Sequence, residues 1–335
     1  MSKVVITGGA GFIGSQLGFA LSSDYDVLLV DNMSAGHEDN LIHEGKRFDN
    51  FICADVRDRS MYEVMSGADY VFHFAGISAL PVNQENPREA VDNNVSGTAN
   101  ILDACRMSGV KKLIFASTSA VYENNKTFPS KESDATDPDL IYAVTKKQCE
   151  MLCNSFSSTY NLNVACMRFF NVYGPHQDFR RKSPPLIGYI IKELMAGRSP
   201  VLHSDGKQRR DYVYVDDLVK LMRVVMESDS RDNGPFNVCS GTTASVEEIF
   251  EEIRHNMRSN IEATYRDPSL LWEKYPSLYQ GKQKLSAQRL IDEVNKYAKG
   301  DPTLTRKTFR WECETTMQTG IKKTVEYALG FGGET

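Results

Sequence analysis

Hydrophobic and polar positions follow two alternating patterns along the first half of the chain. Short runs of β-branched and aromatic residues are separated by longer stretches in which apolar residues recur at helical spacing. The runs predict strands at Lys3–Thr7, Asp26–Asp31, Phe51–Ala54, Tyr70–Phe74, Lys112–Ser117 and Asn163–Arg168. The stretches between them predict helices, among them Phe12–Ser22, Pro87–Met107 and Tyr142–Tyr160. Nearly continuous apolar strands that alternate with helices indicate a doubly wound parallel α/β sheet with both faces covered.

Beyond about residue 175 this alternation is lost. Prolines and glycines divide the chain into shorter pieces, and residues 267–300, which are rich in Tyr, Lys and Leu, show no clear period. We therefore predict two domains, residues 1–174 and a smaller C-terminal α/β lobe over residues 175–335, with some segments of the lobe returning to the first domain. Open α/β sheets bind ligands at the carboxyl ends of their strands, so a substrate is expected between the two.

The composition narrows the class of protein. Of the 335 residues, 41% are hydrophobic and 25% are charged, which is ordinary for a globular protein with a core. A net charge of −5 gives no general attraction for nucleic acid, and no stretch approaches the roughly 18 consecutive apolar residues of a membrane helix. Seven cysteines without a CxxC pair or a Cys/His cluster predict reduced thiols and no metal site. With no targeting segment at the N-terminus, we expect a cytoplasmic protein without nucleic-acid or membrane partners.

A glycine-rich turn, TGGAGFIG at residues 7–14, follows the first predicted strand and begins the first predicted helix. Its glycines Gly8, Gly11 and Gly14 are three residues apart. Such a turn allows close backbone approach to a pyrophosphate, and the helix N-terminus at Phe12 and Ile13 offers free N–H groups and a positive dipole end. The position of this turn predicts a Rossmann-like dinucleotide site.

Carboxylates at the ends of the next two strands specify which dinucleotide is expected. Asp31, followed by Asn32, ends the second strand, where a carboxylate accepts hydrogen bonds from ribose hydroxyls and repels a 2′-phosphate. No arginine follows within three residues, so NAD is favoured over NADP. Asp55 and Val56 follow the third strand and are expected beside the adenine, although Asp55 could instead cap a helix.

Tyr142 and Lys146 lie four residues apart on a predicted helix, and therefore on the same face. A phenol is a poor base at neutral pH, because its unperturbed pKa is about 10. A neighbouring ammonium stabilises the phenolate and lowers that pKa, which makes proton transfer from an alcohol feasible. The pair is therefore predicted to be catalytic.

From Met1 to about Gly241 the chain resembles the extended short-chain dehydrogenase/reductases, in particular the NAD-dependent nucleotide-sugar epimerases and dehydratases. Besides the glycine turn and YxxxK, the matching segments follow in the same order as in that family. They are HFAG at residues 73–76, Asn94-Val95, ASTSAVY at 116–122, RFFNVYGP at 168–175, RDYVYVDD at 210–217 and FNV at 236–238.

The resemblance implies further site residues. Thr118 becomes the third catalytic residue and a hydrogen-bond partner of the substrate. The nicotinamide side of the cofactor is expected against Phe74, Ala75, Gly76 and Asn94, together with Tyr142 and Lys146.

The substrate's diphosphate is expected on Asn171 and Arg210, because an arginine fork suits a phosphate. Of the adjacent pair Arg209 and Arg210, one could instead be merely solvated. The family's glycine after Tyr122 is Glu123 here, so the following loop is expected to differ. A UDP-sugar is the expected substrate and a homodimer the expected assembly.

The residues after Thr118 bear on the reaction. The family's 4,6-dehydratases have Asp-Glu there and its decarboxylases a Glu two residues on, whereas this chain has Ser119-Ala120. An alanine cannot move a proton, so C4 epimerisation through a transient 4-keto sugar is favoured.

A 4-dehydrogenase, a 4-ketoreductase or a 4,6-dehydratase remains the alternative reaction. An NAD-sensing regulator on the same fold remains the non-enzymatic alternative, although such proteins tend to lose the Tyr/Lys pair. Sugar specificity is expected to depend on Ser78–Val82, Phe179–Leu186 and Asp267–Gly300.

Overall fold

The computed structural model describes residues 1–179 and 181–331. Its centre is a seven-stranded sheet in the order β13-β8-β7-β6-β1-β2-β5, in which every pairing is parallel. The strands are β1 (Lys3–Thr7), β2 (Asp26–Asp31), β5 (Phe51–Cys53), β6 (Tyr70–His73), β7 (Lys112–Thr118), β8 (Val164–Phe169) and β13 (Phe236–Val238). The six predicted strands are present, and the doubly wound α/β fold is confirmed. The seventh strand, β13, comes from the second half of the chain.

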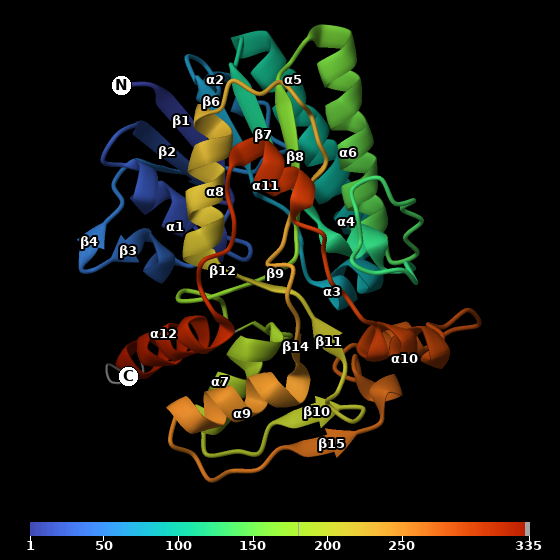
Figure 1. The fold of residues 1–335 in the computed structure, drawn as a ribbon. Helices are drawn as coiled ribbons and strands as arrows, with labels where there is room; N and C mark the ends of the chain where they lie inside the picture. The colour runs from blue at the N-terminus through green and yellow to red at the C-terminus, as the bar shows by residue number, and fades with distance from the viewer. Residues whose placement is uncertain (180, 332–335) are drawn as a thin grey trace.

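Two separate hydrophobic clusters cover the two faces of this sheet. One face packs against α1 (Phe12–Leu21), α8 (Val215–Glu227) and α11 (Thr303–Phe309). The other packs against α2 (Met61–Val64), α5 (Gly97–Ser108) and α6 (Ile141–Tyr160). Strand β7 is buried along its whole length, as expected for a central strand with helices on both sides (Figure 1).

The helix predicted over residues 87–107 is not regular throughout. It comprises α4 (Pro87–Val91), a π-helical turn (Asp92–Ser96) and then α5. The Oγ1 of Thr98 and the Sγ of Cys149 donate to the carbonyl of Asn94 at 2.6 and 3.2 Å. Side chains therefore satisfy the carbonyl inside the irregular turn, and π turns of this kind often occur at functional sites.

A second lobe lies at the end of the sheet opposite the N-terminus, so the carboxyl ends of the parallel strands face it (Figure 1). Its core is formed by α7 (Leu186–Met195), α9 (Val246–Asn256) and α12 (Met317–Phe331). Three strand pairs complete it: β9 (Asn171–Tyr173) with β12 (Tyr212–Tyr214), β10 (Val201–His203) with β15 (Thr264–Arg266), and β11 (Arg209–Arg210) with β14 (Ala244–Ser245). A capping box between Ser245 and Glu248 fixes the start of α9.

Residues 267–298 pass between the lobe and the sheet domain. They contain two 3₁₀ turns (Pro268–Leu270 and Pro276–Tyr279) and α10 (Ala287–Asn295). Trp272, Tyr275, Leu278 and Leu290 of this segment pack against Leu140, the residue before α6. The remaining short elements are η1 (Glu38–Leu41), the β3–β4 hairpin (Ile42–His43, Lys46–Arg47), α3 (Leu80–Glu85) and the 3₁₀ turn Ser119–Tyr122. No helix within residues 1–179 and 181–331 is long and apolar enough to cross a membrane.

Candidate active site

The glycine turn closes tightly on itself between β1 and α1. Gly8 has φ +74°, and a Cβ at Gly14 would lie 2.2 Å from the carbonyl oxygen of Gly8. A Cβ at Gly8 would lie 2.8 Å from the backbone nitrogen of Ala75, in the loop after β6. Both positions therefore require glycine, for the conformation and for the close approach of neighbouring backbone.

The start of α1 fits an anionic group. Its N-cap is Gly11, and no side chain caps the helix. The first-turn N–H groups, those of the predicted residues Phe12 and Ile13 among them, therefore have no capping acceptor. Together with the helix dipole this makes a pyrophosphate site, so the residues present fit the dinucleotide.

Asp31 lies at the end of β2, beside this turn. Its two carboxylate oxygens accept the backbone N–H groups of Ala10 and Met33 at 3.1 and 2.9 Å. Burial raises the pKa of Asp31, while these two hydrogen bonds lower it. Each oxygen retains a further lone pair for a ribose hydroxyl.

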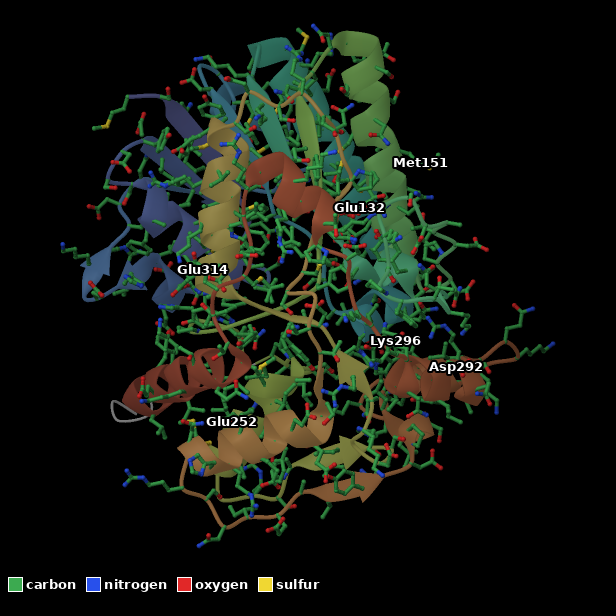
Figure 2. All side chains as sticks on the ribbon, viewed as in Figure 1. Glu132, Met151, Glu252, Asp292, Lys296 and Glu314 are labelled. Atoms are coloured by element: carbon green, nitrogen blue, oxygen red, sulfur yellow. The ribbon has the colours of Figure 1, made fainter. Side chains whose placement is uncertain are left out.

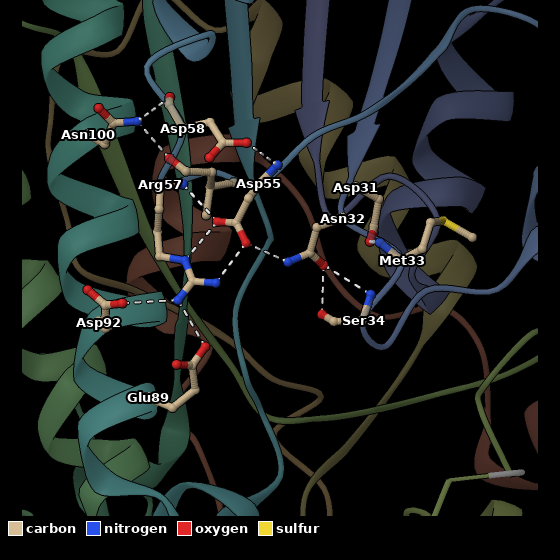
Figure 3. Close-up of polar contacts among 11 residues, drawn as sticks. Asp31, Asn32, Met33, Ser34, Asp55, Arg57, Asp58, Glu89, Asp92 and Asn100 are labelled. Carbon is tan, nitrogen blue, oxygen red and sulfur yellow. Dashed lines mark hydrogen bonds and ion pairs between the residues drawn. The ribbon is translucent and has the colours of Figure 1, made fainter.

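Asp55 is held by a network that the sequence did not predict (Figure 3). Its oxygens accept three hydrogen bonds from Arg57 and one from Asn32, at 2.8–2.9 Å. The other Nη of Arg57 pairs with Glu89 and Asp92 at 2.9 and 3.0 Å. These bonds hold the pKa of Asp55 well below its usual range, so the carboxylate is charged and oriented.

The alternative role of Asp55 as a helix cap does not hold in the structure. The helix that follows, α2, begins at Met61 with Ser60 as its N-cap residue. The contact of Asp55 and Val56 with adenine stays a prediction.

Gly76, Asn94 and Lys146 meet beside the end of β6. Asn94 Oδ1 accepts the N–H of Ile77 at 2.8 Å, and its Nδ2 donates to Thr145 at 3.1 Å. A Cβ at Gly76 would lie 3.1 Å from Asn94 Oδ1 and 3.6 Å from Lys146 Nζ. Gly76, at the end of the loop that carries Phe74 and Ala75, thus lies next to α6. The contact of these residues and Asn94 with the nicotinamide stays a prediction.

Tyr142 and Lys146 lie on the first turns of α6. Thr118, the last residue of β7, lines the same cavity as Tyr142. Burial raises the pKa of Tyr142, whereas its contact with the Thr118 side chain and the charge of Arg181 lower it. Lys146 Nζ instead donates to the carbonyl of Ala116 at 2.8 Å. Among the described residues, Arg181, which the sequence did not single out by itself, is a cation whose charge lowers the pKa of Tyr142.

A cavity of about 370 Å³ lies between the sheet domain and the second lobe. Of the predicted residues, Thr118, Tyr142, Asn171 and Arg210 line it. The three segments expected to set specificity also reach it, through Ser78, Leu80, Arg181, Pro185, Leu186, Glu293, Lys296, Tyr297 and Ala298. Figure 2 shows Lys296 between the two halves of the molecule, and Asp292 on α10 farther out.

The two neighbouring arginines point to different surroundings. Arg210 lines the cavity and donates to the carbonyls of Glu293 and Val294 at 3.0 and 2.9 Å and to its own neighbour's carbonyl at 3.1 Å. A guanidinium carries more N–H donors than these three bonds use. Arg209 forms an ion pair with Glu248 at 2.8 Å. Adjacent residues of a strand point to opposite sides, which is why only one of the pair reaches the cavity.

Asn171 begins β9 at the cavity wall. Its Nδ2 donates to the carbonyl of Asp211 at 2.9 Å, and its backbone N–H donates to the same oxygen at 3.2 Å. The amide is thereby fixed in orientation. The diphosphate contacts of Asn171 and Arg210 stay predictions.

The sequence did not name as site residues three charged residues that line the cavity, Glu123, Glu293 and Lys296, or Arg289, which pairs with two of them. Arg289 donates to Glu123 at 2.7 Å and lies 3.4 Å from Glu293, and Lys296 lies 2.5 Å from the other oxygen of Glu293. Their residue types follow no motif, and only the departure from glycine at Glu123 signalled anything unusual. Among the described residues there is no group of three or more His, Cys, Asp or Glu side chains that could hold a metal ion.

A parallel sheet, a dinucleotide turn and a buried Tyr–Lys pair beside the cavity define the class of short-chain dehydrogenase/reductases. The sequence profile of the NAD dependent epimerase/dehydratase family matches residues 4–239. The chain belongs to this family, so the resemblance is confirmed, as is the prediction that NAD is the cofactor.

Relatives in this family differ in reaction. A putative UDP-glucose 4-epimerase of Methanocaldococcus jannaschii is 33% identical over 79% of this chain and 86% of its own length. A UDP-N-acetyl-alpha-D-glucosaminuronate decarboxylase of Bacillus cytotoxicus is 35% identical over 77% and 81%. The solved structure of the UDP-N-acetylglucosamine 4-epimerase from Methanobrevibacter ruminantium superposes with a TM-score of 0.86 at 30% identity, covering 98% of this chain and 99% of that one.

Proposed function

We propose that this protein is an NAD-dependent epimerase that inverts C4 of a UDP-sugar through a transient 4-keto intermediate. The observation that carries the proposal is the convergence of Thr118 and Tyr142 in a cavity whose wall next to them is Ser119 and Ala120. The similarity to UDP-sugar 4-epimerases supports it.

In this reaction each predicted site residue has its own role. Tyr142 removes the proton of the C4 hydroxyl and later returns it, while Thr118 hydrogen-bonds the same oxygen and keeps the phenol in place. Lys146, held by the Ala116 carbonyl, orients the ribose next to the nicotinamide and contributes positive charge when the phenolate forms. Bound NAD supplies the hydride acceptor and then the hydride donor for C4. Asn171 and Arg210 bind the diphosphate.

The carboxylates of the cavity argue against water loss or decarboxylation. Among the described residues that line it, the carboxylates are Glu123 and Glu293. Glu123 accepts hydrogen bonds from two backbone N–H groups and from Arg289, and Glu293 lies between Arg289 and Lys296. Both are engaged in ion pairs, so neither offers the free acid or base that a 4,6-dehydratase or a decarboxylase needs.

One experiment tests the reaction. The purified enzyme is incubated with UDP-glucose, UDP-N-acetylglucosamine and UDP-glucuronate in turn, with NMR of the sugar and absorbance of the reduced cofactor recorded together. Interconversion with the C4 epimer without NADH accumulation is expected. Stoichiometric NADH would show a 4-dehydrogenase, a 4-keto-6-deoxy sugar would show a dehydratase, and no turnover of any sugar would favour a regulatory role. The predicted homodimer is checked in the same preparation by light scattering.

A further inference from the structure

Glu123 holds the beginning of the helix that carries Tyr142. Its side chain is fully buried. Its Oε1 accepts the backbone N–H groups of Asp139 and Leu140 at 2.5 and 2.8 Å. These two residues come directly before α6, and Tyr142 is the second residue of that helix. The position of the phenol therefore depends on where this carboxylate lies.

The other oxygen of the same carboxylate binds a distant segment. Oε2 of Glu123 accepts a hydrogen bond from Nη2 of Arg289 at 2.7 Å, across 166 residues of sequence. Arg289 belongs to α10, whose C-terminal carbonyls, those of Glu293 and Val294, accept hydrogen bonds from Arg210. Helix α10 is thus attached to Glu123 near one end and to the predicted diphosphate residue at the other.

Packing reinforces this connection. Leu290, next to Arg289, is fully buried in a cluster with Leu140, which precedes α6. Hydrophobic contact and ion pair therefore join the same two places, the first turn of α10 and the start of the catalytic helix. A shift of α10 would be transmitted to α6 because close-packed side chains do not deform freely.

Resting on the proposed function, we propose that Glu123 is a positioning residue that couples the placement of α10 around the bound nucleotide sugar to the placement of Tyr142. When the diphosphate binds Arg210, the C-terminal end of α10 becomes less mobile. Because Arg289 of the same helix is bonded to Glu123, the position of Glu123, and with it the start of α6, becomes fixed as well. The enzyme then has its proton-transfer group fully aligned when the substrate is in place.

The chemistry requires a carboxylate at this position. Both oxygens of Glu123 act as acceptors, toward backbone N–H groups on one side and a guanidinium on the other. In Glu123→Gln one of these acceptors becomes an NH₂ group that faces another donor. The substitution keeps the size of the side chain but removes either the bonds to the backbone N–H groups of Asp139 and Leu140 or the bond to Arg289. Glu123→Gln is therefore the informative variant.

The first test is steady-state kinetics, measured with the nucleotide sugar that the wild-type enzyme turns over fastest. We expect Glu123→Gln to lower kcat by about 10- to 100-fold, as misplacement of a catalytic group does, and to shift the apparent pKa of the kcat profile. Arg289→Met should lower kcat in the same way and raise KM for the nucleotide sugar. The double variant should be no worse than the poorer single variant, because both remove one connection. Arg289→Lys, which keeps the charge, should recover part of the loss.

Hydrogen exchange with UDP as the probe gives a second readout that does not need turnover. In the wild-type holoenzyme, UDP should slow exchange both in α10 and at residues 139–142. In Glu123→Gln it should slow exchange in α10 alone. Because this holds whatever reaction the enzyme performs, failure of the proposed reaction and failure of the coupling are distinguishable.

The matched control is Arg266→Gln. Arg266 pairs with Glu273 at 2.7 Å, both side chains are exposed, and neither residue lines the cavity. Its kcat, KM and exchange pattern should stay at wild-type values. The coupling is refuted if Glu123→Gln lowers only the melting temperature, if the effects of the two single variants on kcat add, or if UDP still protects residues 139–142 in Glu123→Gln.

Discussion

The cofactor side and the substrate side of the site are built from different parts of the chain. On the side predicted to bind the cofactor, the backbone of one strand–turn–helix unit forms the turn that fits a pyrophosphate, and Gly8 and Gly14 leave no room for a side chain. On the substrate side, the cavity wall is made of side chains from segments as far apart as residues 78 and 298.

The two sides should therefore differ in how well they tolerate amino-acid substitutions. A backbone cradle fails when one atom is added, because the neighbouring carbonyl cannot move without breaking its own bonds. On the other side, contacts between charged side chains are shared among several partners, as where Glu293 pairs with both Arg289 and Lys296, so the loss of one contact need not disrupt the fold. Substitutions on the first side should therefore affect folding and cofactor binding, and substitutions on the second should affect catalysis and substrate affinity.

The largest effect on turnover is expected from Tyr142, which is predicted to lie between the cofactor and the substrate. Tyr142→Phe should reduce turnover by about 10²–10⁴-fold, because only the proton-transferring hydroxyl is lost. NAD binding and the melting temperature should stay close to wild type, measured by calorimetry and thermal unfolding. Wild-type turnover in this variant would exclude Tyr142 as the acid–base group.

The next largest effect is on KM for the nucleotide sugar, and it should differ between Arg210 and Arg209. Arg210→Met should raise KM for the nucleotide sugar by about 10- to 100-fold, as expected for charge-assisted bonds of about 1.5–3 kcal/mol. Arg209→Met, which removes the pair with Glu248 and two hydrogen bonds to Thr243, all outside the cavity lining, should change KM by less than about threefold. Equal effects in steady-state kinetics would mean that the cavity does not distinguish the two positions.

A smaller effect, of a different kind, is expected on the cofactor side. Gly14→Ala places a Cβ 2.2 Å from the Gly8 carbonyl and should lower the free energy of unfolding by about 1–3 kcal/mol, with weaker NAD binding. In the control Gly330→Ala, no atom lies within 4 Å of the added Cβ, so stability should be unchanged or slightly higher. Denaturant unfolding and NAD titration measure both. Tight NAD binding by Gly14→Ala would contradict the role of the turn.

The smallest effect concerns the choice of dinucleotide. Asp31→Asn removes the charge that repels a 2′-phosphate but keeps an acceptor for the N–H of Ala10 or Met33. The ratio of NAD to NADP affinity should fall by about tenfold, a change of roughly 1.4 kcal/mol. Calorimetric titration of both dinucleotides into wild type and variant gives this ratio, and an unchanged ratio would mean that another group sets the preference.

The sequence by itself determined the local parts of this protein. Alternation of apolar runs located the six predicted strands within a residue or two, and the predicted strand and helix on either side of the glycine turn are present as β1 and α1. The spacing of Tyr142 and Lys146 put both on one helical face. These features depend on contacts between residues close in the chain, so period and spacing reveal them.

Only the tertiary structure decided the rest. Which arginine enters the cavity depends on the pairing of β11 with β14, which two adjacent arginines in a sequence do not disclose. Lys146 donates to the Ala116 carbonyl because α6 packs against β7. The charge of Arg181 acts on Tyr142 from a segment that is distant in the sequence. The bond between Glu123 and Arg289 spans 166 residues and follows no period. Long-range contacts between side chains are set by how elements pack, and local pattern carries no information about that packing.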